Sequence, residues 1–250
     1  MTDVNTGTSY DEVPYESVAF VETHPARLSV IAHLFGLKSA PIDKCRVLEL
    51  GSSMGGNIIP MAAYLPRSEF IGIDLSPVQI SAGQKSIESL GLTNIQLLAR
   101  SILDVNEELG KFDYIIVHGV YSWVPDEVKD KILSICSKNL NPNGIAYISY
   151  NTFPGWRMRG MIRDIMRYHA NPFPTPEQRV GQARGLLDFL ASSLAVENKD
   201  DPAIKRAYGL MLQGEVELLR AHPNYYLLHE YLEAVNEPVY FHQFMTAAEK

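Results

Sequence analysis

The stretch Val47-Leu-Glu-Leu-Gly-Ser-Ser-Met-Gly-Gly-Asn57 decides the fold of this 250-residue chain. An apolar run reaches Leu50, a glycine-containing turn follows at once, and a second apolar run begins at Ile58. This order of strand, turn and helix is typical of α/β domains that bind a nucleotide-type ligand, because glycine allows a sharp turn and a close approach of the ligand. The spacing Glu49-x-Gly51-x-x-x-Gly55 differs from the G-x-G-x-x-G pattern that binds a pyrophosphate.

Further apolar runs follow and alternate with amphipathic segments. The predicted strands are Arg46–Leu50, Phe70–Asp74, Ile95–Ala99, Phe112–His118 and Ile145–Tyr150, and the helices between them cover about 55–64, 77–90 and 126–139. Continuous apolar runs suit strands buried on both faces, and their alternation with helices implies parallel strands joined by right-handed crossovers. The sequence therefore predicts the α/β class, with a Rossmann-like parallel sheet and helices on both faces. The turn signal Asn141-Pro-Asn-Gly144 directly precedes the last strand.

The chain is predicted to contain three regions. Residues 1–40 form an arm and a helix, residues 41–153 form the Rossmann-like core, and residues 154–250 form a helical region inserted after strand five. Helical patterns in that region cover about 177–195, 203–220 and 223–235. The last segment, Pro238–Lys250, has the character of the helix that precedes a sixth strand in this fold. We therefore expect a fragment of a longer protein whose five-stranded sheet has an open edge, which favours homodimerisation or aggregation.

Bulk composition narrows the function. The formal net charge of −7 disfavours nucleic acid as a partner, because neutralising phosphates requires a basic surface. No apolar run approaches the roughly 18 residues of a membrane span, and the polar N-terminus is unlike a secretory signal, so a cytoplasmic location is expected. Cys45 and Cys136 are the two cysteines, and His222, His229 and His242 are scattered, so no disulfide framework or metal site is predicted.

The chemistry at the strand ends favours S-adenosylmethionine as the cofactor. Glu49 suits a cationic ligand, and the methionine part of this cofactor carries an ammonium and a sulfonium but no phosphate. Asp74, about 20 residues past the turn, can accept hydrogen bonds from both ribose hydroxyls, and Ser101 and Ile102 follow the third strand, where adenine is expected. Alternatively, both acids are plain charged strand ends and the glycines are plain turn residues. The predicted cofactor contacts are Glu49, Gly51, Ser52, Gly55, Asn57, Asp74, Leu75, Ser101, Ile102, His118, Gly119, Val120 and Tyr15.

Several longer motifs carry a family resemblance. They are Tyr10-Asp-Glu-Val-Pro-Tyr15, Thr23-His-Pro25, His118-Gly-Val-Tyr-Ser-Trp-Val-Pro125 and Tyr150-Asn-Thr-Phe-Pro-Gly-Trp156. With these motifs the chain resembles, from about Tyr10 to its C-terminus, the bacterial methyltransferases that carry a "methyltransferase regulatory domain". Rickettsial outer-membrane-protein lysine methyltransferases belong to this group. The resemblance implies a class I methyltransferase core with a helical regulatory region at about 154–235, and protein lysine as one acceptor class.

No catalytic residue is assigned, because methyl transfer from an activated sulfonium requires alignment and exclusion of water rather than a catalytic triad. The candidates near the acceptor are His118, Tyr121, Trp123, Tyr150 and Asn151, and for the aromatic ones plain packing is the alternative. Tyr10 and Tyr15 are expected either to cover the cofactor as a lid or to pack the arm. The acceptor is a protein lysine or a small molecule.

Two other functions compete with an active methyltransferase. The chain could hold S-adenosylmethionine or its demethylated product without turnover, as a regulatory module. A nicotinamide-dependent oxidoreductase is disfavoured by Glu49 and by the glycine spacing. The Asn/Asp-Pro-Pro-Tyr/Phe motif of many adenine-methylating enzymes is missing from the sequence, which lowers the case for base methylation.

Overall fold

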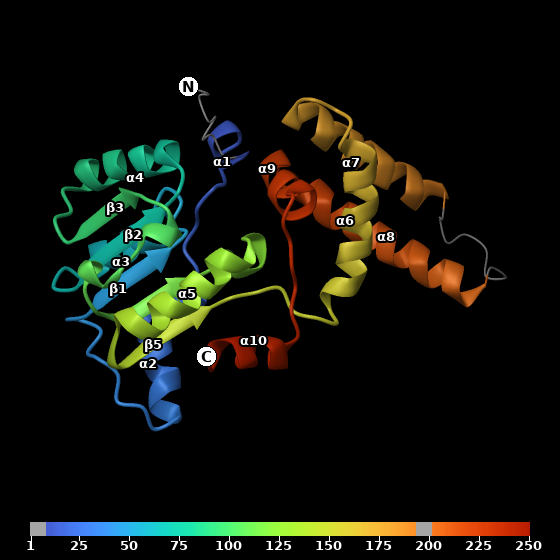
Figure 1. Ribbon diagram of the computed structural model, residues 1–250. Coiled ribbons are helices and arrows are strands. Elements are labelled where there is room, and N and C mark those ends of the chain that lie inside the picture. The colour runs from blue at the N-terminus through green and yellow to red at the C-terminus, as the bar shows by residue number, and fades with distance from the viewer. Residues whose placement is uncertain (1–8, 194–201) are drawn as a thin grey trace. The chain divides into compact units, whose positions relative to one another are not determined.

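The molecule is built around a five-stranded sheet in which every neighbouring pair is parallel (Figure 1). The structure, a computed structural model, describes residues 9–193 and 202–250. The strands are β1 (Arg46–Leu50), β2 (Glu69–Asp74), β3 (Ile95–Ala99), β4 (Phe112–Val117) and β5 (Leu140–Ile148), and their order across the sheet is β3-β2-β1-β4-β5. The predicted α/β class with a Rossmann-like parallel sheet is confirmed.

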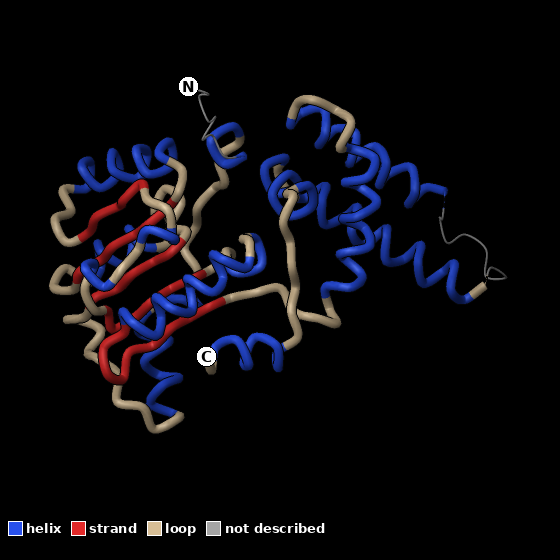
Figure 2. Tube along the Cα trace, viewed as in Figure 1, coloured by secondary structure: helices blue, strands red, loops and turns tan. Residues whose placement is uncertain are grey.

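Helices cover both faces of this sheet, as the alternation of strands (red) and helices (blue) in Figure 2 illustrates. In β1, Val47 packs with one cluster of buried residues, whereas Leu48 and Leu50 pack with the other. This alternation follows from the two-residue period of a strand. The first cluster draws on α2 (Pro25–Leu34), α3 (Ile58–Tyr64) and α4 (Pro77–Leu90), and the second on α5 (Asp126–Asn139).

β5 begins earlier than the sequence indicates, because the predicted turn lies inside it. Phe112 of β4 pairs with Leu140, but Tyr114, two residues later, pairs with Ile145. The intervening residues Asn141–Gly144 make an excursion, with Asn143 in the left-handed region at φ +65°. The turn chemistry was therefore interpreted correctly, while the first strand residue was not.

Shorter helical elements lie in the N-terminal segment, in the loops after β3 and β4, and near the end of the chain. These are α1 (Ser9–Glu12), the 3-10 turns η1 (Val21–Thr23), η2 (Ile102–Asp104), η3 (Glu107–Leu109) and η4 (Tyr121–Trp123), and α10 (Phe241–Ala248). His24 caps α2, with the His24 Nδ1 accepting from the Ala26 N–H at 3.1 Å.

The chain divides into two compact units, Met1–Thr152 with Val235–Lys250, and Phe153–Ala234. The second unit contains α6 (Trp156–Ala170), α7 (Pro176–Ser193), α8 (Ala203–Ala221), α9 (Asn224–Leu227) and the π-helical turn η5 (Leu228–Leu232). Its core is apolar at helical spacing, with Ile162, Met166, Val180, Leu187 and Leu212 buried. The predicted helix over 177–195 extends past Ser193 into residues that lie outside the described part of the chain.

The expected helical region of 154–250 differs from this division at its end. The Val239 N–H donates to the Asn151 carbonyl at 3.0 Å, and the Glu237 N–H donates to the Ser122 carbonyl at 2.8 Å. These backbone bonds tie Val235–Lys250 to the loops that follow β4 and β5. The final helix α10 therefore belongs to the unit that contains the sheet.

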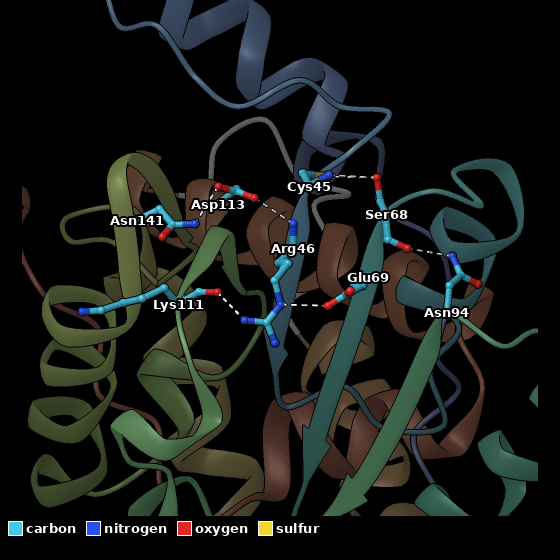
Figure 3. Close-up of polar contacts among 8 residues, drawn as sticks. All are labelled: Cys45, Arg46, Ser68, Glu69, Asn94, Lys111, Asp113 and Asn141. Atoms are coloured by element: carbon cyan, nitrogen blue, oxygen red, sulfur yellow. Dashed lines mark hydrogen bonds and ion pairs between the residues drawn. The ribbon is translucent and has the colours of Figure 1, made fainter.

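The amino ends of the strands are tied together by a polar network (Figure 3). The Asp113 carboxylate accepts from the Arg46 N–H at 2.8 Å and from the Asn141 side-chain amide at 2.8 Å, which links β1, β4 and β5. The Arg46 guanidinium donates to Glu69 at 3.0 Å and to the Lys111 carbonyl at 2.7 Å. On the other side, Ser68 accepts from the Cys45 N–H at 3.1 Å and the Asn94 amide donates to the Ser68 carbonyl at 2.9 Å. These contacts fix the amino ends of the strands, whereas the predicted site lies at their carboxyl ends.

Candidate functional site

The turn after β1 is closely packed at Gly51. Gly51 lies at φ +77°, and a Cβ there would lie 2.3 Å from the Val120 Cγ2. The N–H groups of Gly51 and Ser52 both donate to the Ile73 carbonyl, at 2.8 and 3.0 Å. Only glycine satisfies both the backbone angle and this contact. The turn is thereby held under the end of β2, and Val120, which follows β4, covers it.

The other two glycines of the motif make room for the protein itself. A Cβ at Gly55 would lie 2.8 Å from the Ile59 Cδ1, and one at Gly56 would lie 2.1 Å from the Ser17 carbonyl oxygen. Gly55 therefore permits packing inside the sheet unit, and Gly56 permits the close approach of the N-terminal arm. Gly55 was predicted to contact the cofactor, and the structure gives it this packing role.

Glu49 has a buried carboxyl group, and only one of its two oxygens has a hydrogen-bond partner among the described residues. Its Oε1 accepts from the Asn57 side-chain amide at 2.6 Å, while its Oε2 is buried and has no hydrogen-bond partner among the described residues. Burial raises the pKa of Glu49 from 4.5 to about 8; the bond from Asn57 opposes this rise and the charge of Asp74 adds to it. The Ser52 hydroxyl is likewise buried and, within the described part of the chain, unpaired. Unsatisfied buried polar atoms are rare and point to a missing partner.

Asp74 lies at the end of β2 with its carboxylate held by backbone donors. The Ser53 N–H donates to its Oδ2 at 2.7 Å and the Ser76 N–H to its Oδ1 at 2.9 Å. Burial raises the pKa of Asp74, and these backbone bonds oppose the rise. Leu75 supplies a third backbone bond. The two carboxylate oxygens offer about four acceptor positions, so Asp74 can still accept from a ligand. Leu75 beside it is 59% exposed.

The segment after β3 forms η2, and Ser101 caps it. The Ser101 Oγ accepts from the Leu103 N–H at 3.2 Å, so the hydroxyl hydrogen stays available for donation. Ile102 is half-buried and packs against the second core cluster. Ser101 and Ile102 thus place a hydroxyl donor and an apolar side chain after β3, a combination that suits a flat ring with polar edges.

After β4 the chain presents His118, Gly119 and Val120. The His118 ring lies 4.0 Å from the Phe20 ring and 5.9 Å from the Tyr147 ring, measured between centroids. Burial lowers the pKa of His118, against an opposing effect of Glu22, so the imidazole is neutral at pH 7. Gly119 lies at φ +69° with open space where a Cβ would stand.

The N-terminal arm, Asp11–Thr23, runs along this whole edge of the sheet. Beginning after β2, Asp11 accepts from the Ser76 hydroxyl at 2.5 Å, and the Tyr15 carbonyl accepts from the Ser53 hydroxyl at 3.4 Å. Further on, the Gly56 N–H donates to the Ser17 Oγ at 2.9 Å. Tyr15 thus lies at the glycine turn, while the side chain of Tyr10 lies outside the described residues. A lid over the cofactor and plain packing of the arm were both expected for these tyrosines, and both remain predictions.

Asn57 connects the arm to Glu49 instead of facing open space. Its Oδ1 accepts from the Phe20 N–H at 2.9 Å, and its Nδ2 donates to Thr23 at 3.0 Å as well as to Glu49. An asparagine directly before a helix suggests an N-cap, but no cap bond from this side chain forms in α3. Asn57 was predicted to contact the cofactor, and the structure gives its polar atoms protein partners.

The acceptor candidates beyond His118 participate in packing. Tyr121 is buried and lies edge-on to Tyr150, and Tyr150 stacks on Phe244 of α10 at 4.3 Å between ring centroids. Asn151 accepts through its carbonyl from Val239 and donates through its side chain to Asn236 at 3.2 Å. Trp123 is half-buried, and its backbone N–H donates to the Val120 carbonyl at 2.8 Å. These residues hold the C-terminal segment against the sheet unit.

The carboxyl ends of the strands, together the carboxyl edge of the sheet, therefore offer several groups that can bind a ligand. It has an unpaired oxygen on Glu49, an unpaired hydroxyl on Ser52, spare acceptor capacity on Asp74 and a less polar position at Ile102. A ligand with a cation, vicinal hydroxyls and a flat ring matches this order along the strand ends. The residues present fit S-adenosylmethionine.

Comparison with known proteins identifies the family of the chain. The family model described as "Methyltransferase domain" matches residues 42–184, and the chain belongs to this family. A second model, described as "Predicted methyltransferase regulatory domain", matches residues 223–250. The family resemblance expected from the sequence is thereby confirmed.

Relatives in Rickettsia share close to half of the sequence. The solved structure of PKMT2 from Rickettsia typhi in complex with AdoHcy is 44% identical, with a TM-score of 0.83 over 94% of this chain and 44% of that chain. An uncharacterized protein of Rickettsia prowazekii is 46% identical and matches over 97% of this chain and 94% of its own length. Another from the same organism is 47% identical over 96% of this chain and 42% of its own length. The chain thus spans less than half the length of two of these relatives.

None of the helices in residues 9–193 and 202–250 has the length and apolar character to cross a membrane. Within the same ranges, no group of three or more His, Cys, Asp or Glu side chains is arranged to hold a metal ion.

Proposed function

We propose that this chain binds S-adenosylmethionine at the carboxyl edge of its sheet and transfers the methyl group to a nucleophilic acceptor. The observation that carries the proposal is the buried, unpaired Oε2 of Glu49 beside the unpaired hydroxyl of Ser52. Buried polar atoms without partners cost stability, so a ligand that pairs them gains binding energy here. Membership of the methyltransferase-domain family supports the same conclusion.

Each part of the cofactor has residues suited to hold it. Glu49 pairs with the cationic methionine end, and Asp74, pre-oriented by two backbone N–H groups, accepts from the ribose hydroxyls. Ser101 donates to the adenine, and Ile102 packs on its face. Gly119 leaves space for close contact after β4. Gly51, Gly55 and Asn57 shape the site through contacts within the protein.

The cofactor supplies an electrophilic methyl group, and the protein must present a neutral nucleophile in line with it. A lysine of pKa near 10.4 is neutral for only about one molecule in 2,500 at pH 7. His118 is uncharged at that pH because burial lowers its pKa. It is therefore our candidate for receiving a proton from an incoming amine. We take protein lysine as the preferred acceptor, as the family resemblance implies, and a small molecule as the alternative.

Calorimetric titration with S-adenosylmethionine tests the cofactor site. We expect binding that Asp74→Ala and Glu49→Ala each weaken by about tenfold or more, equivalent to about 1.4 kcal/mol. Glu69→Gln is a matched control, because Glu69 and Asp74 are the two end residues of the same strand. If a folded wild-type chain binds no cofactor, or if all three variants bind equally, the proposed site is wrong.

A binding module without turnover is the second candidate function. The packing of Tyr121, Tyr150 and Asn151 against the C-terminal segment favours it, since these side chains have partners within the protein. Incubation with methyl-labelled cofactor and cell extract separates the two functions. An enzyme labels an acceptor, whereas a binding module saturates with cofactor and transfers nothing. Cytoplasmic location and homodimer formation remain predictions.

A further inference from the structure

The N-terminal arm and the cofactor site share one hydrogen-bonded chain. It runs from the arm residue Thr23 through Asn57 to Glu49, with bonds of 3.0 and 2.6 Å. All three side chains are buried, with exposed fractions of 0% for Thr23 and 3% for each of the other two. The chain ends at the unpaired oxygen of Glu49. A displacement at one end of this chain therefore changes the hydrogen bonding at the other.

Asn57 has no spare polar atom with which to absorb a change in the arm. Its Oδ1 accepts from the Phe20 N–H at 2.9 Å. The Thr23 hydroxyl has one hydrogen to donate, and its shorter bond goes to the Phe20 carbonyl at 2.9 Å. The Asn57 Nδ2 uses one hydrogen for Thr23 and the other for Glu49. If the arm leaves, the buried amide loses both partners on that side, which is a costly state. Asn57 must then turn or draw in water, and the Glu49 carboxylate loses its fixed orientation.

The fit of the arm against the turn leaves little freedom. The Gly56 N–H donates to the Ser17 Oγ, and the Ser17 carbonyl lies where a Cβ of residue 56 would stand. The Phe20 ring also contacts the ring of His118, which follows β4, at 4.0 Å between centroids and a tilt of 37°. The arm therefore contacts the groups after β1 and β4 together, and its closed position orders both sides of the site.

We propose that Asn57 and Thr23 are positioning residues that couple closure of the arm to occupation of the cofactor site at Glu49. The inference rests on the proposed function, because the ligand that pairs with Glu49 is taken to be S-adenosylmethionine. A cation that fixes the Glu49 carboxylate favours the Asn57 orientation that also holds the arm. By linkage, an arm held in place strengthens cofactor binding by the same factor.

The test compares Thr23→Val with Thr23→Ser. Valine keeps the shape of the side chain and removes its hydroxyl, whereas serine keeps the hydroxyl. Cofactor affinity is measured by calorimetry, and closure of the arm by hydrogen exchange of the peptide that covers residues 13–24, with and without S-adenosylmethionine. We expect the cofactor to slow exchange in the wild type and in Thr23→Ser. Thr23→Val should exchange faster and bind the cofactor about five- to tenfold more weakly.

The possible results separate this inference from the proposed function. Absence of cofactor binding by the wild-type chain overturns both. Normal binding with equal affinity for the valine and serine variants, and no effect of cofactor on exchange in the arm, overturns the coupling alone. If Thr23→Val fails to fold, Ser17→Ala replaces it, because it removes the bond to Gly56 on a half-buried segment. Ser17→Ala must then give both effects: faster hydrogen exchange in residues 13–24 and weaker binding of S-adenosylmethionine.

Discussion

The amino ends and the carboxyl ends of the strands, here called the amino edge and the carboxyl edge, carry similar polar residues. They differ in how many of their hydrogen-bonding groups have partners. At the amino edge, Asp113 accepts from Arg46 and Asn141, and Arg46 in turn donates to Glu69 (Figure 3). At the carboxyl edge, Glu49 keeps one buried oxygen without a partner among the described residues. The strands are the same, so the difference does not come from the sheet. A fold of this class concentrates its stabilising polar contacts at one edge and leaves binding capacity at the other.

The carboxyl edge also contains residues with unusual backbone angles. Gly51 and Gly119 both lie in the left-handed region, as does the non-glycine residue Ser53 at φ +50°. Ser53 in this conformation directs its N–H to Asp74. The unfavourable backbone angle is thus compensated by a bond that orients a ligand-binding carboxylate. Strained turns and unpaired oxygens occur together at this edge.

Gly51→Ala should produce the largest effect, a loss of stability of about 3–5 kcal/mol. A Cβ there meets the Val120 side chain at 2.3 Å, and the positive φ adds the cost of a left-handed alanine. Gly91→Ala is the control, because Gly91 has φ +64° with open space around its Cβ, and it should lose only about 1–2 kcal/mol. Urea unfolding measures both. Equal losses would mean that the contact with Val120 contributes nothing.

Glu49 should make the stability of the ligand-free protein depend on pH. Its pKa is raised from 4.5 to about 8 in the folded chain, so the folded state holds a proton that the unfolded chain has lost. The associated stability is complete below pH 4.5 and is lost as the pH rises through about 8. We expect Glu49→Gln to remove this dependence, with a difference from wild type on the order of 3 kcal/mol between pH 5 and pH 8.

The measurement is the free energy of unfolding at several pH values in that range. Glu49→Gln should become the more stable protein at pH 8 while binding S-adenosylmethionine more weakly. A variant that is stabilised and yet loses affinity is the signature of a group kept for binding rather than for folding. Parallel pH curves for wild type and variant would contradict the assignment.

The sequence predicts the sheet well because its signals are local. Strand β1, the glycine turn and the acid at Asp74 follow from apolar runs and short spacings. The arm could not be placed in this way. The bond between Phe20 and Asn57 joins residues 37 apart, and the stack of Tyr150 on Phe244 joins the end of the core to the end of the chain. Such pairs depend on tertiary packing, for which neither segment carries a periodic signal.

Asn57 illustrates the limit most clearly. The position directly before α3 makes an N-cap or a ligand contact the natural expectation, and both depend on residues nearby in sequence. Its actual partners include Phe20 and Thr23, which belong to a segment without strong periodicity. One signal was present: the dipeptide Gly55-Gly56 directly before Asn57 allows another backbone to approach. It does not reveal whether that backbone belongs to a ligand or to the chain.

Glu69→Gln should produce the smallest effect and tests the other side of the comparison. Glu69 forms an ion pair with Arg46 at 3.0 Å, but its side chain is 69% exposed and the pair is screened by solvent. Arg46 keeps its bond to the Lys111 carbonyl in this variant, so β1 and β4 stay linked. We expect a change in stability below about 0.5 kcal/mol by urea unfolding and unchanged cofactor affinity. A larger loss of stability would mean that this exposed ion pair, and not the half-buried hydrogen bonds of Asp113, keeps the amino ends of the strands together.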